Sequence, residues 1–395
     1  MNIIFLGLMY CEELMPQLMK KSRTGLQIAP HKFQKNLISG LRISEGVDVS
    51  VLNVPIMGSF PINSKSPVSK DYVWENGRNR QVGYLNIPFV KHSIQRRKIK
   101  KALERQIKGR EKQTSIIIYS LYEPFVDAAQ SIKLKYPDVR VCLIQTDAVP
   151  GRDDMEKYMT RAAKRRGDRV VRKAKSFDSF AVLTKHLVDP LECGERPFCV
   201  VECVCDSSQD PDPRISNEKK VCLYTGSLSW EFGIGELCDA FADLENAELW
   251  LCGGGEMSDH VSEMASKYKN IKYFGFVSPD RVAKIRQQAN YLINPRRPSG
   301  TYTRYSFPSK TAEYMMSGKP VIMYKLEGIP DEYDEYLNYL ESDSVMGIKK
   351  ELQEIFEADY DELCSKASNG RSFMLDRTSP KNQAQKIIDL LERKE

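Results

Sequence analysis

The chain has 395 residues, of which 41% are hydrophobic and 28% charged, and its formal net charge is +6. The length favours two domains over one, and the ordinary composition excludes a collagenous, low-complexity or wholly disordered chain. No apolar run approaches the roughly 18 residues of a membrane span, and the apolar start over residues 1–8 is too short for a secretory signal, so we expect a cytoplasmic protein.

Short apolar runs alternate with longer polar or helical stretches through the first half of the chain. This rhythm is typical of a parallel, doubly wound sheet. Between the second and third runs, the polar stretch 57–80 is predicted to form a long loop that borders a substrate cleft. The predicted strands are residues 3–8, 47–52, 115–120, 139–145, 177–183 and 197–204.

Two segments of the first half concentrate positive charge. Residues 91–112 hold ten Lys and Arg against two Glu, a net +8, residues 161–175 carry +7, and the rest of the chain sums to −9. Such a surface attracts anionic lipid or phosphate, or is simply solvated, and no binding motif or interleaved aromatic residue favours nucleic acid. The first segment is predicted to be an amphipathic helix, because its apolar residues recur at near-helical spacing: Ile94, Ile99, Leu103 and Ile107.

The composition changes at residues 205–220, where prolines and charged residues mark a linker. The β/α rhythm then restarts, so we predict domains at 1–205 and 206–379, with a helix over about 380–395 packing back on the first. We expect two Rossmann-like, doubly wound α/β domains facing a central cleft, where open sheets bind ligands. The predicted strands of the second domain are residues 221–225, 247–252, 271–276, 290–295 and 319–324, and its predicted helices are residues 233–244, 256–268, 279–289 and 309–317.

A glycine follows the first of these strands directly. Gly226 precedes a helix that starts near Ile234, and a glycine there lets backbone amides and a helix N-terminus approach a phosphate. A glycine between a strand and a helix is, however, more often only part of a turn. The sequence matches neither G-x-G-x-x-G nor G-x-x-x-x-G-K-[ST], so standard dinucleotide binding and P-loop hydrolysis are disfavoured.

The stretch 294–324 combines a basic, irregular loop with a helix start. Arginines and a helix N-terminus suit a diphosphate, and a carboxylate one turn further on accepts hydrogen bonds from ribose hydroxyls. Ser309 is predicted to be the N-cap of the helix, and a solvated surface helix is the alternative. The candidate residues are Arg296, Arg297, Arg304, Pro308, Ser309, Lys310 and Glu313.

The segment SFPSKTAEYMMSGKPVI within this stretch resembles a block of the GT-B glycosyltransferases of family 4, also called group 1, and especially the bacterial exopolysaccharide and capsule enzymes. In that block a Glu, seven intervening residues and a second Glu precede a small-residue helix and G-x-P-V-I. Residues 178–206, 225–241 and 271–295 are also similar to the family. The resemblance covers about residues 176–340, whereas the first 150 residues share only the β/α rhythm.

The resemblance implies roles for single residues. Glu313 matches the second Glu, which implies binding of the ribose hydroxyls of a donor nucleotide. Phe307 matches the aromatic residue after the first Glu, so backbone amides near Phe307, Pro308 and Ser309 are expected to face the donor sugar or its diphosphate. Gly226 matches the glycine whose loop lies under the diphosphate.

The chain also departs from the family pattern. Tyr305 occupies the position of the first Glu, which removes the usual carboxylate contact to the donor sugar. Ser227 and Phe232 stand where the family has an Arg and a Lys, so two cations commonly set against the diphosphate are missing. We expect four other cations to compensate: Arg296, Arg297, Arg304 and Lys310.

The resemblance implies a hexosyltransferase that moves a sugar from a nucleotide-diphosphate sugar to an acceptor hydroxyl with retention at the anomeric carbon. The expected donor is a UDP-sugar rather than a GDP-sugar, with no metal or other cofactor, because protein cations and helix dipoles stabilise the departing diphosphate. The expected acceptor is a glycan or lipid-linked sugar of bacterial cell-surface polysaccharide. The basic residues 91–112 are expected to hold the protein at the anionic inner face of the cell membrane.

Asp147 is the catalytic candidate of the N-terminal domain. It follows the predicted strand 139–145, at the end of a parallel strand where functional side chains project. Its carboxylate would bind the donor sugar or polarise the acceptor hydroxyl, and capping of the next loop is the alternative. Glu12 and Glu13, beyond the first strand, are further candidates.

Two other functions remain open. The losses at Tyr305, Ser227 and Phe232 favour a catalytically impaired GT-B partner subunit. Another GT-B enzyme, such as a sugar phosphorylase or a nucleotide-sugar epimerase, would depend on phosphate or interconvert UDP-sugars without an acceptor. Donor binding separates the impaired subunit from the enzymes.

Overall fold

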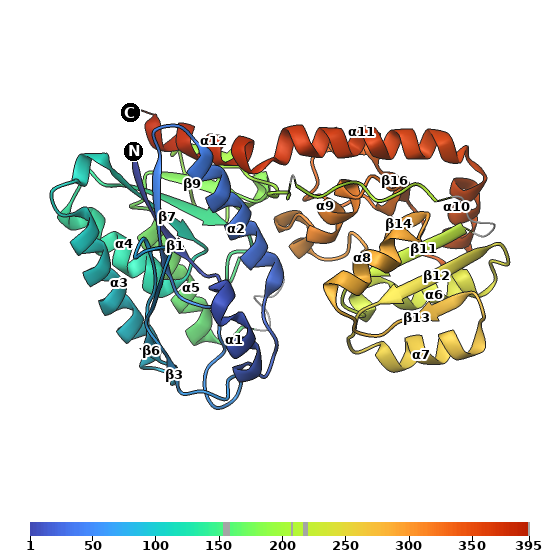
Figure 1. Cartoon of the computed structure of the whole chain (residues 1–395), viewed down its shortest axis with the longest axis horizontal. Coiled ribbons are helices and arrows are strands. Elements are labelled where there is room, and N and C mark those ends of the chain that lie inside the picture. The colour runs from blue at the N-terminus through green and yellow to red at the C-terminus, as the bar shows by residue number, and fades with distance from the viewer. Residues whose placement is uncertain (153–158, 207, 216–219, 394–395) are drawn as a thin grey trace. The chain divides into compact units, whose positions relative to one another are not determined.

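The chain folds into two compact units in the computed structural model (Figure 1). Unit 1 comprises Met1–Asp206 and Thr378–Glu395, and unit 2 comprises Ser207–Arg377. The chain therefore passes from unit 1 to unit 2 and back, near the ends of the predicted domains. The structure describes residues 1–152, 159–206, 208–215 and 220–393.

Unit 1 is built on a sheet of eight strands in the spatial order β10-β9-β8-β7-β1-β2-β5-β4. Neighbouring strands pair parallel except that β4 runs antiparallel to β5. The carboxyl ends of the parallel strands therefore lie at one edge, where ligands usually bind. The strands are β1 (Asn2–Gly7), β2 (Asp48–Asn53), β4 (Tyr72–Trp74), β5 (Asn79–Gln81), β7 (Thr114–Tyr119), β8 (Arg140–Gln145), β9 (Ser179–Val182) and β10 (Phe198–Val200).

Helices cover both faces of this sheet (Figure 1). Helices α2 (Ile28–Ile43) and α12 (Pro380–Glu392) share an apolar core with one face. Helices α3 (Lys91–Ile107), α4 (Glu123–Lys135) and α5 (Arg161–Ala174) cover the other. Helix α12 buries four apolar side chains in this core, those of Ala384, Ile387, Ile388 and Leu391. Burial of a large aliphatic side chain contributes about 1.5–3 kcal/mol to the stability of the fold, so α12 is an integral part of unit 1.

Two predictions for unit 1 are partly wrong. The stretch 57–80, predicted as one loop, contains β3 (Val68–Ser69) and β4, and β3 pairs antiparallel with β6 (Tyr84–Leu85). Strands of two or three residues are too short to produce a visible alternation of apolar and polar residues. The strand predicted over 197–204 ends at Val200, in register with the last residue of its partner β9.

Unit 2 is built on six parallel strands in the order β13-β12-β11-β14-β15-β16. Helices α6, α7 and α10 share its larger apolar core, and α8 and α9 pack on the opposite face (Figure 1). The strands are β11 (Lys220–Thr225), β12 (Ala247–Cys252), β13 (Ile271–Tyr273), β14 (Tyr291–Asn294), β15 (Val321–Tyr324) and β16 (Asn338–Leu340). The helices are α6 (Ile234–Ala242), α7 (Ser258–Lys267), α8 (Pro279–Gln287), α9 (Ser309–Met316), α10 (Val345–Glu357) and α11 (Tyr360–Thr378).

No helix in the described part of the chain is both long and apolar enough to cross a membrane. The ten cysteines are all free thiols, and seven of them are buried. Within the same described residues, no group of three or more His, Cys, Asp or Glu side chains is arranged to hold a metal ion.

Candidate functional site

The sheet of unit 2 has its topological switch point between β11 and β14. These strands are neighbours, but the chain leaves β11 toward β12 on one side and reaches β14 from β13 across the sheet. Ligands of open α/β sheets bind outside the carboxyl ends of the strands at such a point. Gly226 and Ser227 follow β11, and Arg296 and Arg297 follow β14, so the fold brings both predicted segments to this point.

The turn after β11 is held by backbone contacts with the turn after β12. The Gly226 amide donates to the Cys252 carbonyl at 3.0 Å, and the Leu228 amide donates to Gly254 at 3.1 Å. Gly253 has a φ of +144°, and a Cβ there would lie 1.8 Å from the Gly226 carbonyl oxygen. Only glycine permits this approach, so the glycine turn after β12 positions the Gly226 turn after β11.

Helix α9 is anchored to the ends of both switch-point strands. The buried Tyr314 hydroxyl accepts from the Thr225 amide at 2.8 Å and lies 3.1 Å from the Thr225 hydroxyl. At the end of β14, the Asn294 side-chain amide donates to the Thr311 hydroxyl at 3.4 Å. The first turn of α9 is therefore fixed beside the carboxyl ends of β11 and β14.

The N-terminus of α9 lacks a side-chain cap. Pro308 is the N-cap residue, and its carbonyl accepts from the Thr311 amide at 2.9 Å, whereas Ser309 is the first helical residue. The prediction of Ser309 as N-cap is thus wrong by one residue, because Pro308 already has the extended backbone of a cap. The first amides of a helix have no intrahelical acceptor and carry partial positive charge, so this end suits an anion.

Two cations hold the carboxylate of Glu313 on the next turn. Lys310 Nζ lies 2.8 Å from Glu313 Oε2, and Arg286 Nη1 lies 3.4 Å from Oε1. Arg286 is itself fixed by Asp212 through contacts of 2.5 and 3.3 Å, and both of these side chains are buried. Each carboxylate oxygen has more than one lone pair, so Glu313 is oriented and retains acceptor capacity.

Arg296 is supported by aromatic rings. Its guanidinium lies 5.4 Å from the centroid of Phe232 and 4.7 Å from that of Tyr302, within cation–π range. No carboxylate pairs with it among the described residues, and its Nε has no hydrogen-bond partner there. The family has a Lys at the position of Phe232, and here the Phe232 ring contacts another cation, Arg296, at the switch point.

The other three expected cations are paired with acidic groups. Arg297 lies 3.1 Å from Glu236 and donates to the Asp343 carbonyl at 2.9 Å. Arg304 Nε donates to Glu327 at 2.9 Å, and Lys310 pairs with Glu313 as described above. Arg296 is therefore the best placed of the four to receive a diphosphate.

The remaining predicted residues have mainly packing contacts. Tyr305 and Phe307 are buried at 8% and 6% exposure, and the Phe307 ring packs on Tyr333 at 5.2 Å between centroids. The Ser227 carbonyl accepts from the Tyr224 hydroxyl at 2.8 Å. Tyr305 thus places a buried aromatic side chain where the family has a carboxylate.

Asp147 follows β8 at the carboxyl edge of the sheet of unit 1. The Thr146 hydroxyl donates to Asp147 Oδ2 at 3.3 Å, and it also lies 3.0 Å from the Tyr119 hydroxyl. Desolvation by the surrounding protein raises the pKa of the Asp147 carboxyl above its ordinary value, while the Thr146 hydrogen bond lowers it. The residue remains exposed to solvent, which screens this effect. Residues 153–158, at the end of the loop predicted after Asp147, lie outside the described residues.

The other acidic candidates of unit 1 have local partners. Glu12 pairs with Lys35, and Glu13 accepts from the Cys11 thiol. Sequence reasoning missed Arg286, Asp212 and Tyr302, because their contacts join segments that are distant in the chain or lie within an irregular loop. An isolated charged or aromatic residue in such a segment is usually a surface residue.

Known proteins resemble this chain in part of its sequence and in its fold. Residues 219–357 match the family described as glycosyl transferases group 1. Sucrose-phosphate synthase from Thermosynechococcus elongatus superposes with a TM-score of 0.67 at 13% identity, covering 99% of this chain and 98% of that one. The apo lipopolysaccharide outer core galactosyltransferase WaaB, at 14% identity, and Anabaena HepE in complex with UDP, at 13%, each give 0.63 with 99% of both chains covered.

The chain therefore has the GT-B fold, and residues 219–357 of its C-terminal unit are similar to the group 1 glycosyltransferases. The predicted fold class, two Rossmann-like α/β domains, is confirmed. The resemblance to the group 1 glycosyltransferases is confirmed over residues 219–357. A curated protein, an ATP-dependent RNA helicase from Pongo abelii, is 29% identical over 106 residues. That match covers 25% of this chain, and it spans only 10% of the length of the helicase.

Proposed function

We propose that the chain is a retaining hexosyltransferase that transfers a sugar from a UDP-sugar to a hydroxyl of a glycan or lipid-linked acceptor in bacterial cell-surface polysaccharide synthesis. The observation that carries this proposal is the arrangement at the switch point of unit 2: the uncapped N-terminus of α9, the stacked Arg296 and the oriented Glu313. The group 1 match of residues 219–357 and a structural neighbour described in complex with UDP support the same donor class.

The proposed catalysis depends on stabilising the negative charge of the leaving diphosphate. During transfer, the bond between the anomeric carbon and the diphosphate oxygen breaks, and negative charge grows on the leaving diphosphate. The acceptor oxygen bonds to the same face of that carbon, and the acceptor hydroxyl gives its proton to the leaving diphosphate oxygen. Preorganised cations and amides aimed at that charge lower the barrier without a metal or other cofactor, a role that we give to Arg296 and the first amides of α9. Glu313 accepts hydrogen bonds from the ribose hydroxyls.

Asp147 of unit 1 has the remaining role in the proposal. An ionised carboxylate binds a hydroxyl of the donor sugar or polarises the acceptor hydroxyl. Its solvent exposure and its location at the carboxyl edge of the sheet support such a role.

The buried ring of Tyr305 favours a second candidate, a GT-B partner subunit that has lost donor chemistry. This candidate predicts a folded protein that binds no nucleotide sugar. A sugar phosphorylase or a nucleotide-sugar epimerase, in contrast, would bind its sugar donor and would depend on phosphate or act without an acceptor.

A thermal-shift panel with UDP, GDP, ADP and their common sugar conjugates tests the proposal on wild type and on Glu313→Ala. A ligand at a hundredfold excess over its Kd stabilises the folded state by about 2.7 kcal/mol. We expect stabilisation by the uridine compounds in wild type and a much smaller shift in Glu313→Ala. A folded protein that responds to none of these ligands would support the impaired subunit instead.

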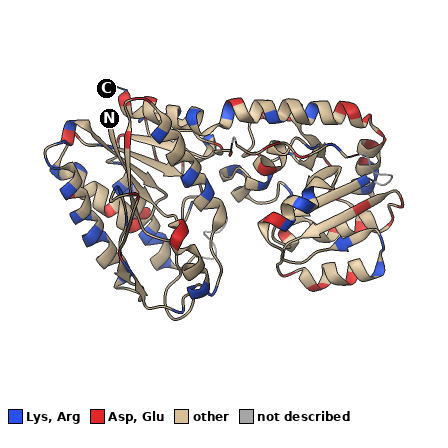
Figure 2. Cartoon of the chain, in the orientation of Figure 1, with Lys and Arg blue, Asp and Glu red and all other residues tan. Residues whose placement is uncertain are grey.

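Peripheral membrane binding is a further part of the proposal, and a basic and apolar surface of unit 1 supports it. Lys and Arg residues line helix α3 (Figure 2), and Arg97, Lys101 and Arg105 are exposed. Directly before this helix, the Phe89 side chain is 99% exposed, and Ile87 is 42% exposed. Exposed apolar residues beside a basic helix suit the interface of an anionic membrane.

Co-sedimentation with anionic liposomes at low and high salt tests this surface. Phe89→Ser is expected to reduce binding, because it removes the apolar contact and leaves the charge. Met346→Ser is the matched control, since Met346 is 83% exposed in unit 2. Absence of wild-type binding at low salt would remove the membrane from the proposal.

A further inference from the structure

A cavity of about 480 Å³ opens in unit 1 where helices α3 and α4 begin, beside α5. We call it the α3–α4 pocket. Its lining is dominated by charged and titratable side chains, which three separate helices bring together. They are Lys91, His92 and Arg96 of α3, Glu123 and Asp127 of α4, and Arg166 of α5.

The two carboxylates of this pocket are already shared among cations. Glu123 pairs with two arginines of α5, at 3.0 and 3.8 Å, and Asp127 pairs with one cation of α3 and one of α5. The four cations are Arg96, Arg166, Arg169 and Lys173. The Glu123 and Asp127 side chains are only 19% and 10% exposed, whereas those of Arg96 and Arg166 are 47% and 55% exposed. An occupant of the pocket therefore meets the guanidinium groups rather than the carboxylates.

Lys91 adds a further positive charge. No carboxylate of the described residues pairs with it. Burial lowers the pKa of the Lys91 ammonium group, and the nearby Arg166 lowers it further. Burial also lowers the pKa of His92, as do Lys91 and Arg166, although Glu123 raises it. Five Lys and Arg side chains thus stand against two carboxylates, and a bound anion would relieve the repulsion among them.

The groups at the pocket suit a phosphate in particular. Helix α3 begins there without a side-chain cap, since Val90 is its N-cap residue, and the first amides of a helix carry partial positive charge. Arginine forks, a lysine ammonium and a helix N-terminus are the groups that bind phosphate oxygens. A phosphate monoester carries about −1.5 to −2 charge at neutral pH, which matches the excess of positive charge.

The rim of the same pocket is apolar. Phe89 lines the pocket, and its side chain is almost completely exposed to solvent. Ile87 and Val90 beside it are exposed as well. The φ of Phe89 is +68°, a conformation that a bulky residue keeps only where its surroundings enforce it. The exposed ring is therefore a fixed feature of the rim.

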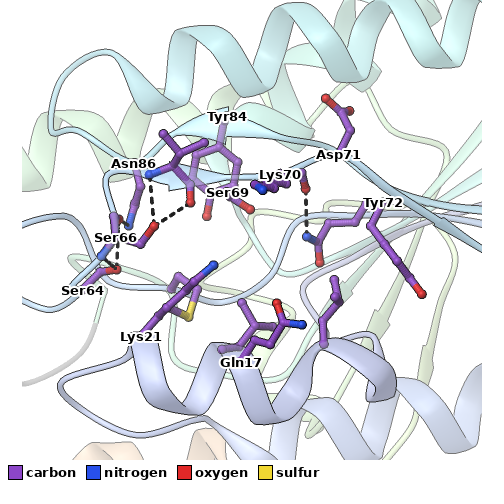
Figure 3. A pocket seen from close by; sticks show the side chains of 15 residues that line it. Gln17, Lys21, Ser64, Ser66, Ser69, Lys70, Asp71, Tyr72, Tyr84 and Asn86 are labelled. Atoms are coloured by element: carbon purple, nitrogen blue, oxygen red, sulfur yellow. Dashed lines mark hydrogen bonds between the residues drawn. The ribbon is translucent and has the colours of Figure 1, made fainter.

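Hydrogen bonds on the neighbouring ribbon of β3 and β6 hold this rim. Figure 3 shows Asn86 beside Ser66 at the end of the ribbon, facing helix α1 (Met15–Lys21). The Asn86 side-chain amide donates to the Gly58 carbonyl at 2.8 Å and to the Ser66 carbonyl at 3.5 Å. Asn86 thus joins the loop after Gly58 to the apolar segment 87–90, and both border the pocket.

We propose that the α3–α4 pocket binds the phosphate group of an anionic membrane lipid, with Phe89 against the acyl chains. The cations and the start of α3 select the phosphate, and the exposed apolar segment selects a lipid as its carrier. This inference rests on the proposed membrane association and gives that association a specific ligand.

Three soluble probes separate the phosphate from its carrier. Dibutyryl phosphatidic acid has both a phosphate and acyl chains, glycerol 3-phosphate has only the phosphate, and dibutyrin has only the acyl chains. The chain has four histidines, and His92 lines the pocket, so its ring resonances in proton–carbon NMR, assigned with His92→Gln, report an occupant there. We expect phosphatidic acid to shift them and to bind about fivefold or more tightly than glycerol 3-phosphate, and dibutyrin to leave them unchanged.

Variants test the two parts of the pocket. Lys91→Gln removes a charge that has no carboxylate partner among the described residues, so we expect unchanged thermal stability and about tenfold weaker binding of dibutyryl phosphatidic acid. Lys101→Gln is the matched control, because Lys101 is exposed on the same helix outside the pocket. Phe89→Ser is expected to reduce the affinity for phosphatidic acid to that for glycerol 3-phosphate, which it leaves unchanged. Circular dichroism establishes that each variant is folded.

Three results would overturn the proposal. The first is that neither phosphate compound shifts the His92 resonances of wild type. The second is an equal loss of affinity in Lys101→Gln and Lys91→Gln, which would indicate a general attraction to the basic helix. The third is equal affinity for phosphatidic acid and glycerol 3-phosphate, which would leave free phosphate rather than a lipid as the ligand.

Co-sedimentation with liposomes of phosphatidylglycerol and phosphatidylcholine separates this inference from the proposed membrane association. If wild type and Lys91→Gln sediment equally and the soluble lipid does not bind, the pocket is wrong and the membrane association stands. If the soluble lipid binds at His92 and the protein does not sediment with liposomes, the membrane association is wrong and the lipid-phosphate pocket stands. The UDP thermal shift tests the transferase proposal independently of both.

Discussion

Replacing Arg296 by glutamine removes the one positive charge that the candidate donor site holds without a carboxylate partner among the described residues. Hydrogen bonds to charged groups contribute about 1.5–3 kcal/mol each. Arg296 is half-buried between Phe232 and Tyr302, so solvent screens part of the charge, and we take a loss of about 2 kcal/mol. This free energy corresponds to an increase of about 30-fold in the Kd for UDP.

Isothermal titration calorimetry with UDP and with uridine measures this loss. Uridine has no phosphate, so its affinity is expected to be the same for wild type and Arg296→Gln. Arg297→Gln is the matched control, because Arg297 pairs with Glu236 and donates to the Asp343 carbonyl. If Arg296→Gln binds UDP like wild type while Arg297→Gln loses UDP, the assignment of the diphosphate cation is refuted.

Three further substitutions test the packing of the candidate donor site in unit 2 and the proposed role of Asp147 in unit 1. Gly253→Ala is expected to lower the free energy of unfolding, measured by urea denaturation, by about 2 kcal/mol or more, because its Cβ would lie 1.8 Å from the Gly226 carbonyl oxygen. Gly254→Ala is the control and is expected to be nearly neutral, because its Cβ would have no neighbour nearer than 4.0 Å. Tyr314→Phe leaves the buried Thr225 amide without its acceptor and is expected to cost about 1–3 kcal/mol in the same assay. The proposed function requires the ionised form of Asp147, so kcat/KM is expected to decrease as pH falls through a pKa above the ordinary Asp value. The pH profile of Asp147→Asn should lack this decrease.

The sequence predicts the fold well where strands are long and fully buried. The β11 segment is one example, since its apolar run followed by Gly226 and a helix has few alternative structures. Helix α3 is another, with Ile99, Leu103 and Ile107 on its buried face as the spacing predicts. The two-residue strands β3 and β6 were missed because such short pairs are held by their tertiary surroundings rather than by a sequence pattern.

The sequence predicts the helix that holds Lys310 and Glu313, and the structure has both residues in α9. The contact between these two side chains was not predicted, although their i,i+3 spacing permits it. The role of Phe232 as a support for Arg296 was not predicted, because the two residues come from loops after different strands. Helix α8 likewise gave no reason to expect that Arg286 orients Glu313.

A crystal structure of the wild-type protein soaked with UDP tests the central claim most directly. The account predicts the diphosphate within hydrogen-bond distance of the Arg296 guanidinium and of the first amides of α9, with the ribose hydroxyls at the Glu313 carboxylate. A nucleotide bound away from the carboxyl ends of β11 and β14, or bound there without contact to Arg296 and Glu313, would contradict it.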